Sequence, residues 1–129
     1  MENKNNKNKK ILIVEDDLPT IEALAFKLNQ KGIPASTALN GEEAIERLKR
    51  EKYDLVLLDI LLPKKNGFEV IKEIKTNGQS KDAKIIIFSN LGQEDNVEKA
   101  MKLGASGYIV KANTSINELA DRIIKELNE

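Results

Sequence analysis

Short apolar runs that each end at a polar or charged side chain constrain the fold of this chain more than any other feature. Runs of about four residues, rich in β-branched side chains, indicate buried strands, because a buried helix needs about ten residues or more. A weaker strand is expected over residues 33–37. The runs and the residues that close them are 11–14 before Glu15, 55–58 before Asp59, 85–88 before Ser89 and 108–110 before Lys111.

Amphipathic helices are predicted between these strands. Ile21, Leu24, Ala25 and Leu28 follow helical spacing between Pro19 and Gly32. Later helices are indicated by Ala44, Ile45 and Leu48 after Asn40, by Phe68, Ile71 and Ile74, by residues 93–103, and by Ile116, Leu119, Ala120, Ile123 and Leu127 after Ser115. Five strands that alternate with five helices predict an α/β, doubly wound parallel sheet, with helices on both faces.

The residues that close the strands are the candidate site, because ligands bind beyond the carboxyl ends of parallel strands. Glu15, Asp16 and Asp59 bring three carboxylates to this edge. Such a cluster is unfavourable unless protons or a cation offset the repulsion. Magnesium prefers oxygen ligands and takes one or two carboxylates plus phosphate oxygens, so Mg²⁺ is the expected cofactor, with Mn²⁺ as an alternative.

Asp59 follows the apolar run 55–58 and is the carboxylate best placed to act as a nucleophile. Ser89 supplies a hydroxyl donor and Lys111 a positive charge, and both would stabilise the oxygens of an incoming phosphoryl group. The set is chemically complete for accepting a phosphoryl group. Asp17, in contrast, is expected only to cap the following helix.

Four segments of the chain resemble the signatures of two-component response-regulator receiver domains, in their order and approximate spacing. They are ILIVEDD, LVLLDILLP, IIIFSN and GASGYIVK, and the resemblance covers residues 10–128. It implies a flavodoxin-like (βα)5 fold with strand order 2-1-3-4-5. It also implies a phosphoacceptor of a two-component or phosphorelay system, which catalyses only its own phosphorylation and dephosphorylation and is otherwise not an enzyme.

The resemblance assigns a role to each site residue. Asp59 would be the phosphoacceptor, and Ser89 and Lys111 would contact the phosphate together with the backbone amide of Asn90. Tyr108 would be the switch partner of Ser89, rotating inward when Ser89 moves and so changing the face built by the fourth helix, fifth strand and fifth helix. The implied metal ligands are Asp16, Asp59, the backbone carbonyl of Leu61, and Glu15 through water.

Three residues depart from the common receiver pattern. Ala112 follows Lys111 where receivers commonly have proline with a cis bond, which leaves the aim of Lys111 and the isomer of this peptide bond open. Leu61 has no polar group to position a hydrolytic water, and Asn90 is larger than the usual alanine or glycine. We therefore expect slow autodephosphorylation.

Composition limits the remaining possibilities. The 129 residues include no cysteine and no histidine, which excludes disulfides, thiolate or imidazole metal sites and histidine-dependent triads. Residues 1–10 are expected to form a flexible Lys/Asn-rich tail before a receiver domain over 11–129. No secretory signal, membrane span or nucleic-acid-binding footprint stands out, so a cytoplasmic location without direct nucleic-acid or membrane contact is expected.

A histidine kinase or phosphotransfer protein is the implied donor. The downstream protein target is expected to act in trans, and phosphorylation could drive homodimerisation. Two other functions are open. A haloacid-dehalogenase-type phosphatase also uses a strand-end aspartate and magnesium, but it normally has a second aspartate where Leu61 stands. An interaction module with a receiver-like fold would signal without phosphorylation.

Overall fold

The sheet is the centre of the molecule. The structure, a computed structural model, describes residues 9–62, 64, 66–77, 79–90 and 94–128. Five parallel strands lie in the order β2-β1-β3-β4-β5, as the flavodoxin-like class requires. Their bounds are β1 Ile11–Val14, β2 Ala35–Ala38, β3 Leu55–Leu58, β4 Lys84–Ser89 and β5 Gly107–Val110. The predicted fold class is confirmed.

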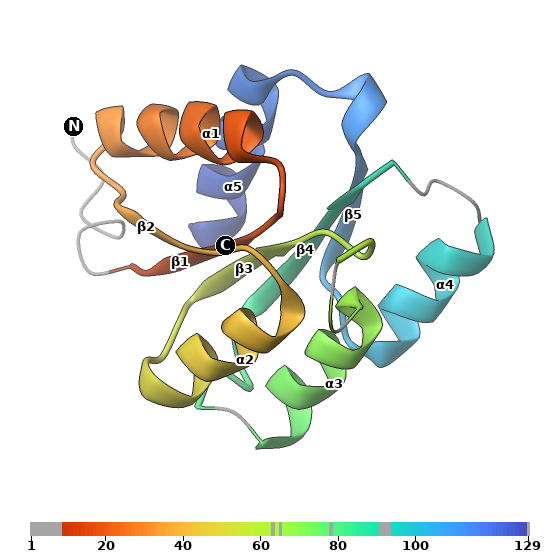
Figure 1. Ribbon diagram of the computed structural model, residues 1–129. Coiled ribbons are helices and arrows are strands. Elements are labelled where there is room, and N and C mark those ends of the chain that lie inside the picture. Colours follow the sequence, from red (N-terminus) through yellow and green to blue (C-terminus); the bar gives the residue numbers. More distant parts are fainter. Residues whose placement is uncertain (1–8, 63, 65, 78, 91–93, 129) are drawn as a thin grey trace.

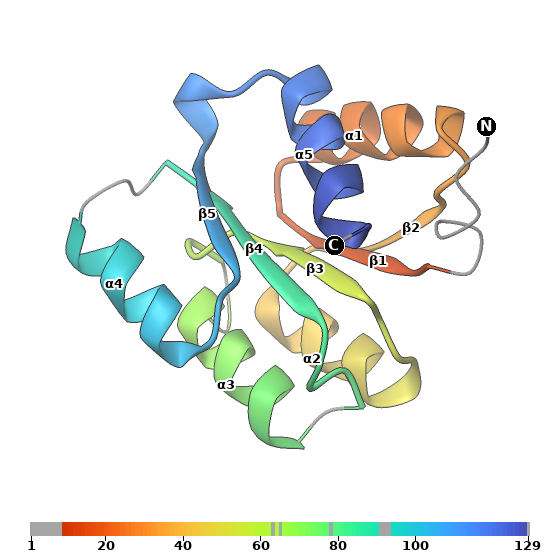
Figure 2. The same ribbon diagram turned by 180° about the vertical axis from the view of Figure 1, so that it is seen from behind.

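Five helices cover both faces of this sheet. α1 and α5 pack together on one face, and α2, α3 and α4 lie on the other, as the two opposite views show (Figure 1, Figure 2). Their bounds are α1 Leu18–Gln30, α2 Gly41–Arg50, α3 Gly67–Asn77, α4 Glu94–Leu103 and α5 Ile116–Leu127. A doubly wound domain therefore has two hydrophobic cores, one on each side of the sheet.

Each central strand contributes to both cores because successive side chains point to opposite faces. In β1, Ile11 and Ile13 pack with α1 and α5, whereas Leu12 and Val14 pack with α2 and α3. β3 is buried in the same way along its whole length. This is why the strands appear in the sequence as continuous apolar runs instead of alternating ones.

Two element boundaries differ from the sequence expectation. β2 begins at Ala35, not Ile33, because the Ile33 amide donates to the Leu28 carbonyl at 2.9 Å and so completes the end of α1. Pro34, the next residue, has no amide hydrogen that it could donate to a neighbouring strand. In α3, Ile71 and Ile74 are buried as predicted, but Phe68 is only half-buried and Val70 is fully buried. The Lys99 ammonium lies 4.3 Å from the centre of the Phe68 ring.

Helix capping follows the sequence closely. Asp17 caps α1 by accepting from the Thr20 amide, as predicted for this carboxylate. Asn40 accepts from the Glu43 amide at the start of α2. Ser115 begins α5 with a capping box, in which its Oγ accepts from the Glu118 amide and its amide donates to the Glu118 carboxylate. These caps fix where each helix starts, and therefore how long each loop at the carboxyl edge of the sheet is.

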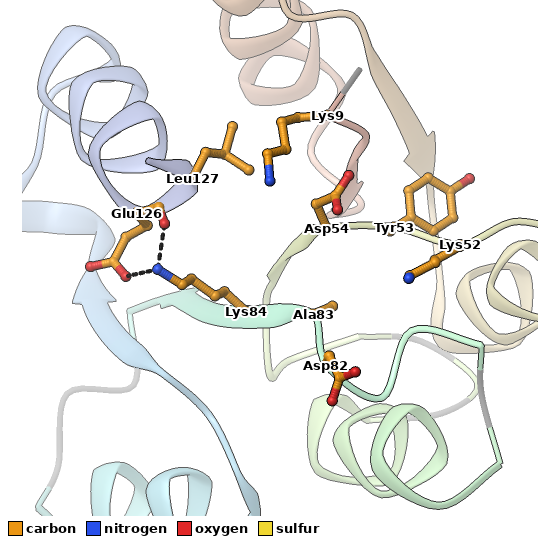
Figure 3. A pocket seen from close by; sticks show the side chains of 9 residues that line it. All are labelled: Lys9, Lys52, Tyr53, Asp54, Asp82, Ala83, Lys84, Glu126 and Leu127. Atoms are coloured by element: carbon orange, nitrogen blue, oxygen red, sulfur yellow. Dashed lines mark hydrogen bonds and ion pairs between the residues drawn. The ribbon is translucent and has the colours of Figure 1, made fainter. Parts of the chain in front are cut away.

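At the amino ends of the strands, hydrogen bonds join segments that are distant in the sequence. Lys10 accepts from the Asp54 amide at 2.8 Å, so this residue of the predicted tail is tied to the domain, whereas residues 1–8 lie outside the described residues. A cavity of about 230 Å³ opens here, far from the predicted site (Figure 3). Lys84, one of the residues that line the cavity, donates to the Glu126 carbonyl at 2.5 Å.

Candidate functional site

Strand register brings the predicted residues to one edge of the sheet. Val14 is aligned with Leu58, so Glu15 and Asp59 follow neighbouring positions, and the Asp59 amide donates to the Val14 carbonyl at 3.1 Å. Ser89 closes β4 opposite Val110 of β5, and Lys111 follows. The carboxyl ends of β1, β3, β4 and β5 thus carry the five candidate side chains, as the sequence predicts.

The three consecutive acids after β1 have three different environments. Glu15 is 1% exposed and its Oε2 accepts from the Asp17 amide at 3.0 Å. Asp16 is exposed at the mouth of the site, and Asp17 caps α1. Carboxylate oxygens of Glu15, Asp16 and Asp59 lie within 4.8 Å of one another. A cluster of one exposed and two buried carboxylates fits a hard divalent cation that retains water ligands.

Lys111 is the positive charge of this cluster. Its Nζ lies 2.5 Å from Oε1 of Glu15 and 2.8 Å from Oδ2 of Asp59. Burial lowers the pKa of the Lys111 ammonium, but the hydrogen bonds to Asp59 and Glu15 outweigh burial and raise the pKa overall. For Glu15, burial raises the pKa of the carboxyl group and Lys111 offsets part of the effect. The lysine is therefore held charged between two buried acids.

The peptide bond after Lys111 is trans, since the described residues contain no cis peptide bond. Lys111 begins a 3-10 turn, η2 Lys111–Asn113, which the sequence analysis did not predict. The ammonium nevertheless reaches Asp59. The doubt about the aim of Lys111, which arose from Ala112, is thus resolved without a cis bond at this position.

The backbone after Asp59 is fixed from two sides. The Leu61 amide donates to Oδ1 of Asp59 at 3.1 Å, while the Leu61 side chain is 58% exposed beside the site. Gly67, the first residue of α3, donates to the Ile60 carbonyl at 2.9 Å. A Cβ at Gly67 would lie 2.6 Å from the Ile60 Cα and 2.8 Å from the Asp59 carbonyl oxygen. Only glycine allows this close approach.

Ser89 and Tyr108 lie on the same face of the sheet. Ser89 is fully buried, and strand alternation puts it on the side of Ile85 and Ile87, where Tyr108 also packs. Burial raises the pKa of the Tyr108 hydroxyl, and the Asp59 charge adds to the effect. Tyr108 is half-buried. The two predicted switch residues therefore lie on the same side of the sheet, and Tyr108 is near enough to Asp59 for the charge of that carboxylate to act on its hydroxyl group.

Two features of the site were not found by sequence reasoning. Gly67 was not among the predicted site residues, although a glycine directly before an amphipathic helix can signal close packing. The Asn90 side chain was judged by size alone, yet its Oδ1 accepts from the Ala112 amide at 3.0 Å. No local sequence pattern links residues 22 positions apart.

The fold and this cluster define a class of protein: a parallel α/β domain with an acidic pocket and a lysine at the carboxyl edge of its sheet. Residues 11–124 match the response regulator receiver domain family, and the chain belongs to that family. Receiver domains are the phosphoaccepting signalling modules of two-component systems. This family match favours the receiver over the haloacid-dehalogenase-type phosphatase.

Individual relatives agree with this assignment. The chain is 39% identical over 103 residues to the chemotaxis protein CheY of Halobacterium salinarum, covering 80% of this chain and 84% of that protein. It is 36% identical over 104 residues to the alkaline phosphatase synthesis transcriptional regulatory protein PhoP of Bacillus subtilis, covering 81% of this chain and 42% of that protein. The chain spans about half the length of the transcriptional regulators that it matches.

Solved structures give the same result. The BeF3-activated receiver domain of Klebsiella pneumoniae RstA superposes with a TM-score of 0.82 at 32% identity, covering 94% of this chain and 100% of that one. A two-component response regulator from Clostridium difficile has a TM-score of 0.85 at 27% identity, covering 95% and 98% of the two chains. In the part of the chain that the structure describes, no helix is long and apolar enough to cross a membrane.

Proposed function

We propose that Asp59 accepts a phosphoryl group from a histidine kinase or a phosphotransfer protein. A carboxylate oxygen of Asp59 attacks the phosphorus atom, the new P–O bond forms, and the bond to the donor breaks with its electron pair leaving on the donor atom. The observation that carries the proposal is the 2.8 Å contact between Lys111 and Asp59 inside a cluster of three carboxylates. The charge that offsets Asp59 before transfer is positioned to contact phosphoryl oxygens afterwards.

The same cluster supports a requirement for Mg²⁺. Asp16, Asp59 and the Leu61 carbonyl would hold the ion, with Glu15 acting through water. When bound, the ion neutralises negative charge that develops during transfer. One Lys111 ammonium lies between two buried carboxylates, Glu15 and Asp59, so the cluster keeps an excess of negative charge that a cation would offset. The exposed Asp16 carboxylate offers a further oxygen ligand. Ser89 and the Asn90 amide are proposed as further phosphate contacts.

Mass measurement after incubation with Mg²⁺ and acetyl phosphate tests this function. We expect a stable adduct of roughly 80 Da, one phosphoryl group, on the wild-type chain and none on Asp59→Ala. Asp82→Ala, an exposed aspartate at the opposite edge of the sheet, is the matched control and should still take the group. Turnover of phosphate esters would instead support a phosphatase. An unmodified wild-type chain would support an interaction module.

We also propose that phosphorylation is read through Ser89 and Tyr108. A move of Ser89 toward the phosphoryl group would vacate space for the Tyr108 ring and so alter the face of α4, β5 and α5. Effects of this size shift an existing equilibrium by a few kcal/mol. A downstream protein target and a phosphorylation-linked homodimer would use this face. A cytoplasmic location and the absence of nucleic-acid contact stay predictions from the sequence.

The chain contains only two tyrosines, which makes the switch measurable. In fluorotyrosine-labelled protein, we expect the ¹⁹F signal of Tyr108 to shift on phosphorylation. Tyr53 should not shift, because it is 1% exposed, bonds Glu51 at 2.8 Å and lies at the other edge of the sheet. In Ser89→Ala the Tyr108 shift should be lost. A full shift in that variant would contradict the coupling.

A further inference from the structure

One side chain joins the segments that follow β4 and β5. Asn90 follows Ser89 at the end of β4, and Ala112 follows Lys111 after β5. Oδ1 of Asn90 accepts from the Ala112 amide at 3.0 Å. This bond links the two segments by a side chain, just beyond the point where the backbones of Ser89 and Val110 are paired. It is independent of the Asn90 backbone amide, which is a separate proposed phosphate contact.

The bond acts on the short turn that carries Lys111 after the paired end of β5. Lys111 begins η2, a turn of three residues without a side-chain cap, in which the Thr114 amide donates to the Lys111 carbonyl at 3.2 Å. Short 3-10 turns have poor hydrogen-bond geometry and hold their shape weakly. A lysine side chain has four flexible carbons, so its ammonium is aimed only if its backbone is fixed.

Asn90 and Ala112 also depend on each other chemically. The donor is the amide of the peptide that joins Lys111 to Ala112, and this peptide is trans. A proline at position 112 would have no amide hydrogen to donate. The acceptor requires a side chain longer than alanine at position 90. Two of the three departures from the receiver pattern, Asn90 and Ala112, therefore meet in a single hydrogen bond.

We propose that the Asn90 side chain is a positioning residue for Lys111, which it aims at Asp59 through the Ala112 amide. The inference rests on the proposed phosphoacceptor function and adds a residue to it. Because Asn90 is bonded to Ser89 in the chain, the same contact ties any movement of Ser89 to the backbone of Lys111. Asn90 does not touch the phosphoryl group with its side chain in this role.

Asn90→Ala tests the proposal, since it removes the acceptor and keeps the backbone amide. A single hydrogen bond of this kind corresponds to roughly a 2- to 10-fold change in an equilibrium or rate. We expect the rate constant for phosphorylation by acetyl phosphate to fall by about this factor. Hydrogen exchange of the Ala112 amide, measured on unphosphorylated protein, should become faster. The control is Asn113→Ala, an exposed residue of the same turn, which should change neither quantity.

A second background separates positioning through Ala112 from other effects. In Ala112→Pro the donor is already absent, so adding Asn90→Ala should not slow phosphorylation further. The proposal is overturned by unchanged Ala112 exchange, by an unchanged rate in Asn90→Ala, or by a full additional loss in the Ala112→Pro background. If the wild-type chain takes no phosphoryl group, both the proposed function and the role of Asn90 fail. If wild type and Asn90→Ala react equally, only the role of Asn90 fails.

Discussion

Acidic residues at the carboxyl ends of the strands have different roles, although all carry a carboxylate. Glu15 and Asp59 are buried and share Lys111, whereas Asp16 is exposed and Asp17 caps a helix. Desolvation of Glu15 is tolerated because a cation lies 2.5 Å away. The four acids therefore cannot be exchanged for one another, although three of them are adjacent in sequence.

Leu61 carries a prediction about the lifetime of the phosphorylated state. Its exposed apolar side chain stands beside Asp59 and has no hydrogen-bonding atom to orient an attacking water. We expect Leu61→Asn to lose the phosphoryl group about tenfold faster, well below the ~10²–10⁴-fold effect of a fully placed general base. The decay of the phosphorylated protein after removal of the donor measures this.

Leu39→Asn, another exposed leucine that follows β2, is the control and should decay like wild type. A wild-type half-life that is no longer than that of Leu61→Asn would contradict the expectation of slow autodephosphorylation.

Gly67 carries a prediction about the position of Asp59. In Gly67→Ala the new Cβ would meet backbone atoms of Asp59 and Ile60, which cannot rotate away. We expect the free energy of unfolding to fall by about 1–3 kcal/mol, the usual cost of overpacking, and phosphorylation to slow. Urea unfolding and the acetyl phosphate reaction measure the two effects.

Gly32→Ala separates strain from collision. Gly32 has φ +83° but open space around its missing Cβ, so alanine there should cost about 1–2 kcal/mol of stability. Because Gly32 lies between α1 and β2, away from Asp59, the Gly32→Ala variant should be phosphorylated at the wild-type rate. Equal slowing in both variants would show that lost stability, not displacement of Asp59, is the cause.

At the scale of the element, the capping box makes the stability of α5 depend on pH. The Ser115 amide and hydroxyl form hydrogen bonds with the Glu118 carboxylate and backbone, and they lower the pKa of Glu118. A pKa that is lower in the folded state contributes stability above the ordinary value of 4.5, and this contribution is lost as pH falls through the lowered pKa. α5 should thus be better anchored at neutral pH than in acid.

Urea unfolding of Glu118→Ala tests this sign. Its unfolding midpoint should lie below that of wild type at pH ~7, and the gap should narrow at pH ~3, where the carboxylate becomes protonated. Glu22→Ala, which removes an exposed carboxylate on α1, is the control for general charge effects. A gap that stays constant with pH would mean that Glu118 acts only through helix propensity.

At the scale of the whole molecule, hydrogen bonds between distant segments stabilise the side of the domain opposite the site, at the amino ends of the strands. The Tyr53 amide donates to Oγ of Ser80 at 2.7 Å, and both residues are buried. Ser80→Ala would leave this amide without its acceptor, at a cost of about 1–3 kcal/mol. Urea unfolding should detect this loss, while Ser36→Ala, half-buried on the edge strand β2, should change stability less.

Phosphorylation should be unaffected by Ser80→Ala in the folded protein, because Ser80 and Asp59 lie at opposite edges of the sheet. A slower reaction at temperatures where the variant is fully folded would show that the two edges are coupled.

Local sequence patterns predicted the central strands, most helix starts and the residue types at the strand ends. Each of these follows from local rules: β-branched runs of four residues, helical spacing of apolar side chains, and caps such as Asn40 and Ser115. Parallel connectivity then forces the strand ends to one edge, which is why Glu15, Asp16, Asp59, Ser89 and Lys111 could be named as one candidate site.

Which of these groups are in contact could be seen only in the folded molecule. The ion pairs of Lys111 with Glu15 and Asp59, the packing of Gly67 on Ile60 and the bond from Ala112 to Asn90 join residues between 7 and 96 positions apart. No periodicity or cap reports on such distances. They arise when the segments after four different strands are folded against one another, as in the hydrogen bond from the Ala112 amide to Asn90 Oδ1.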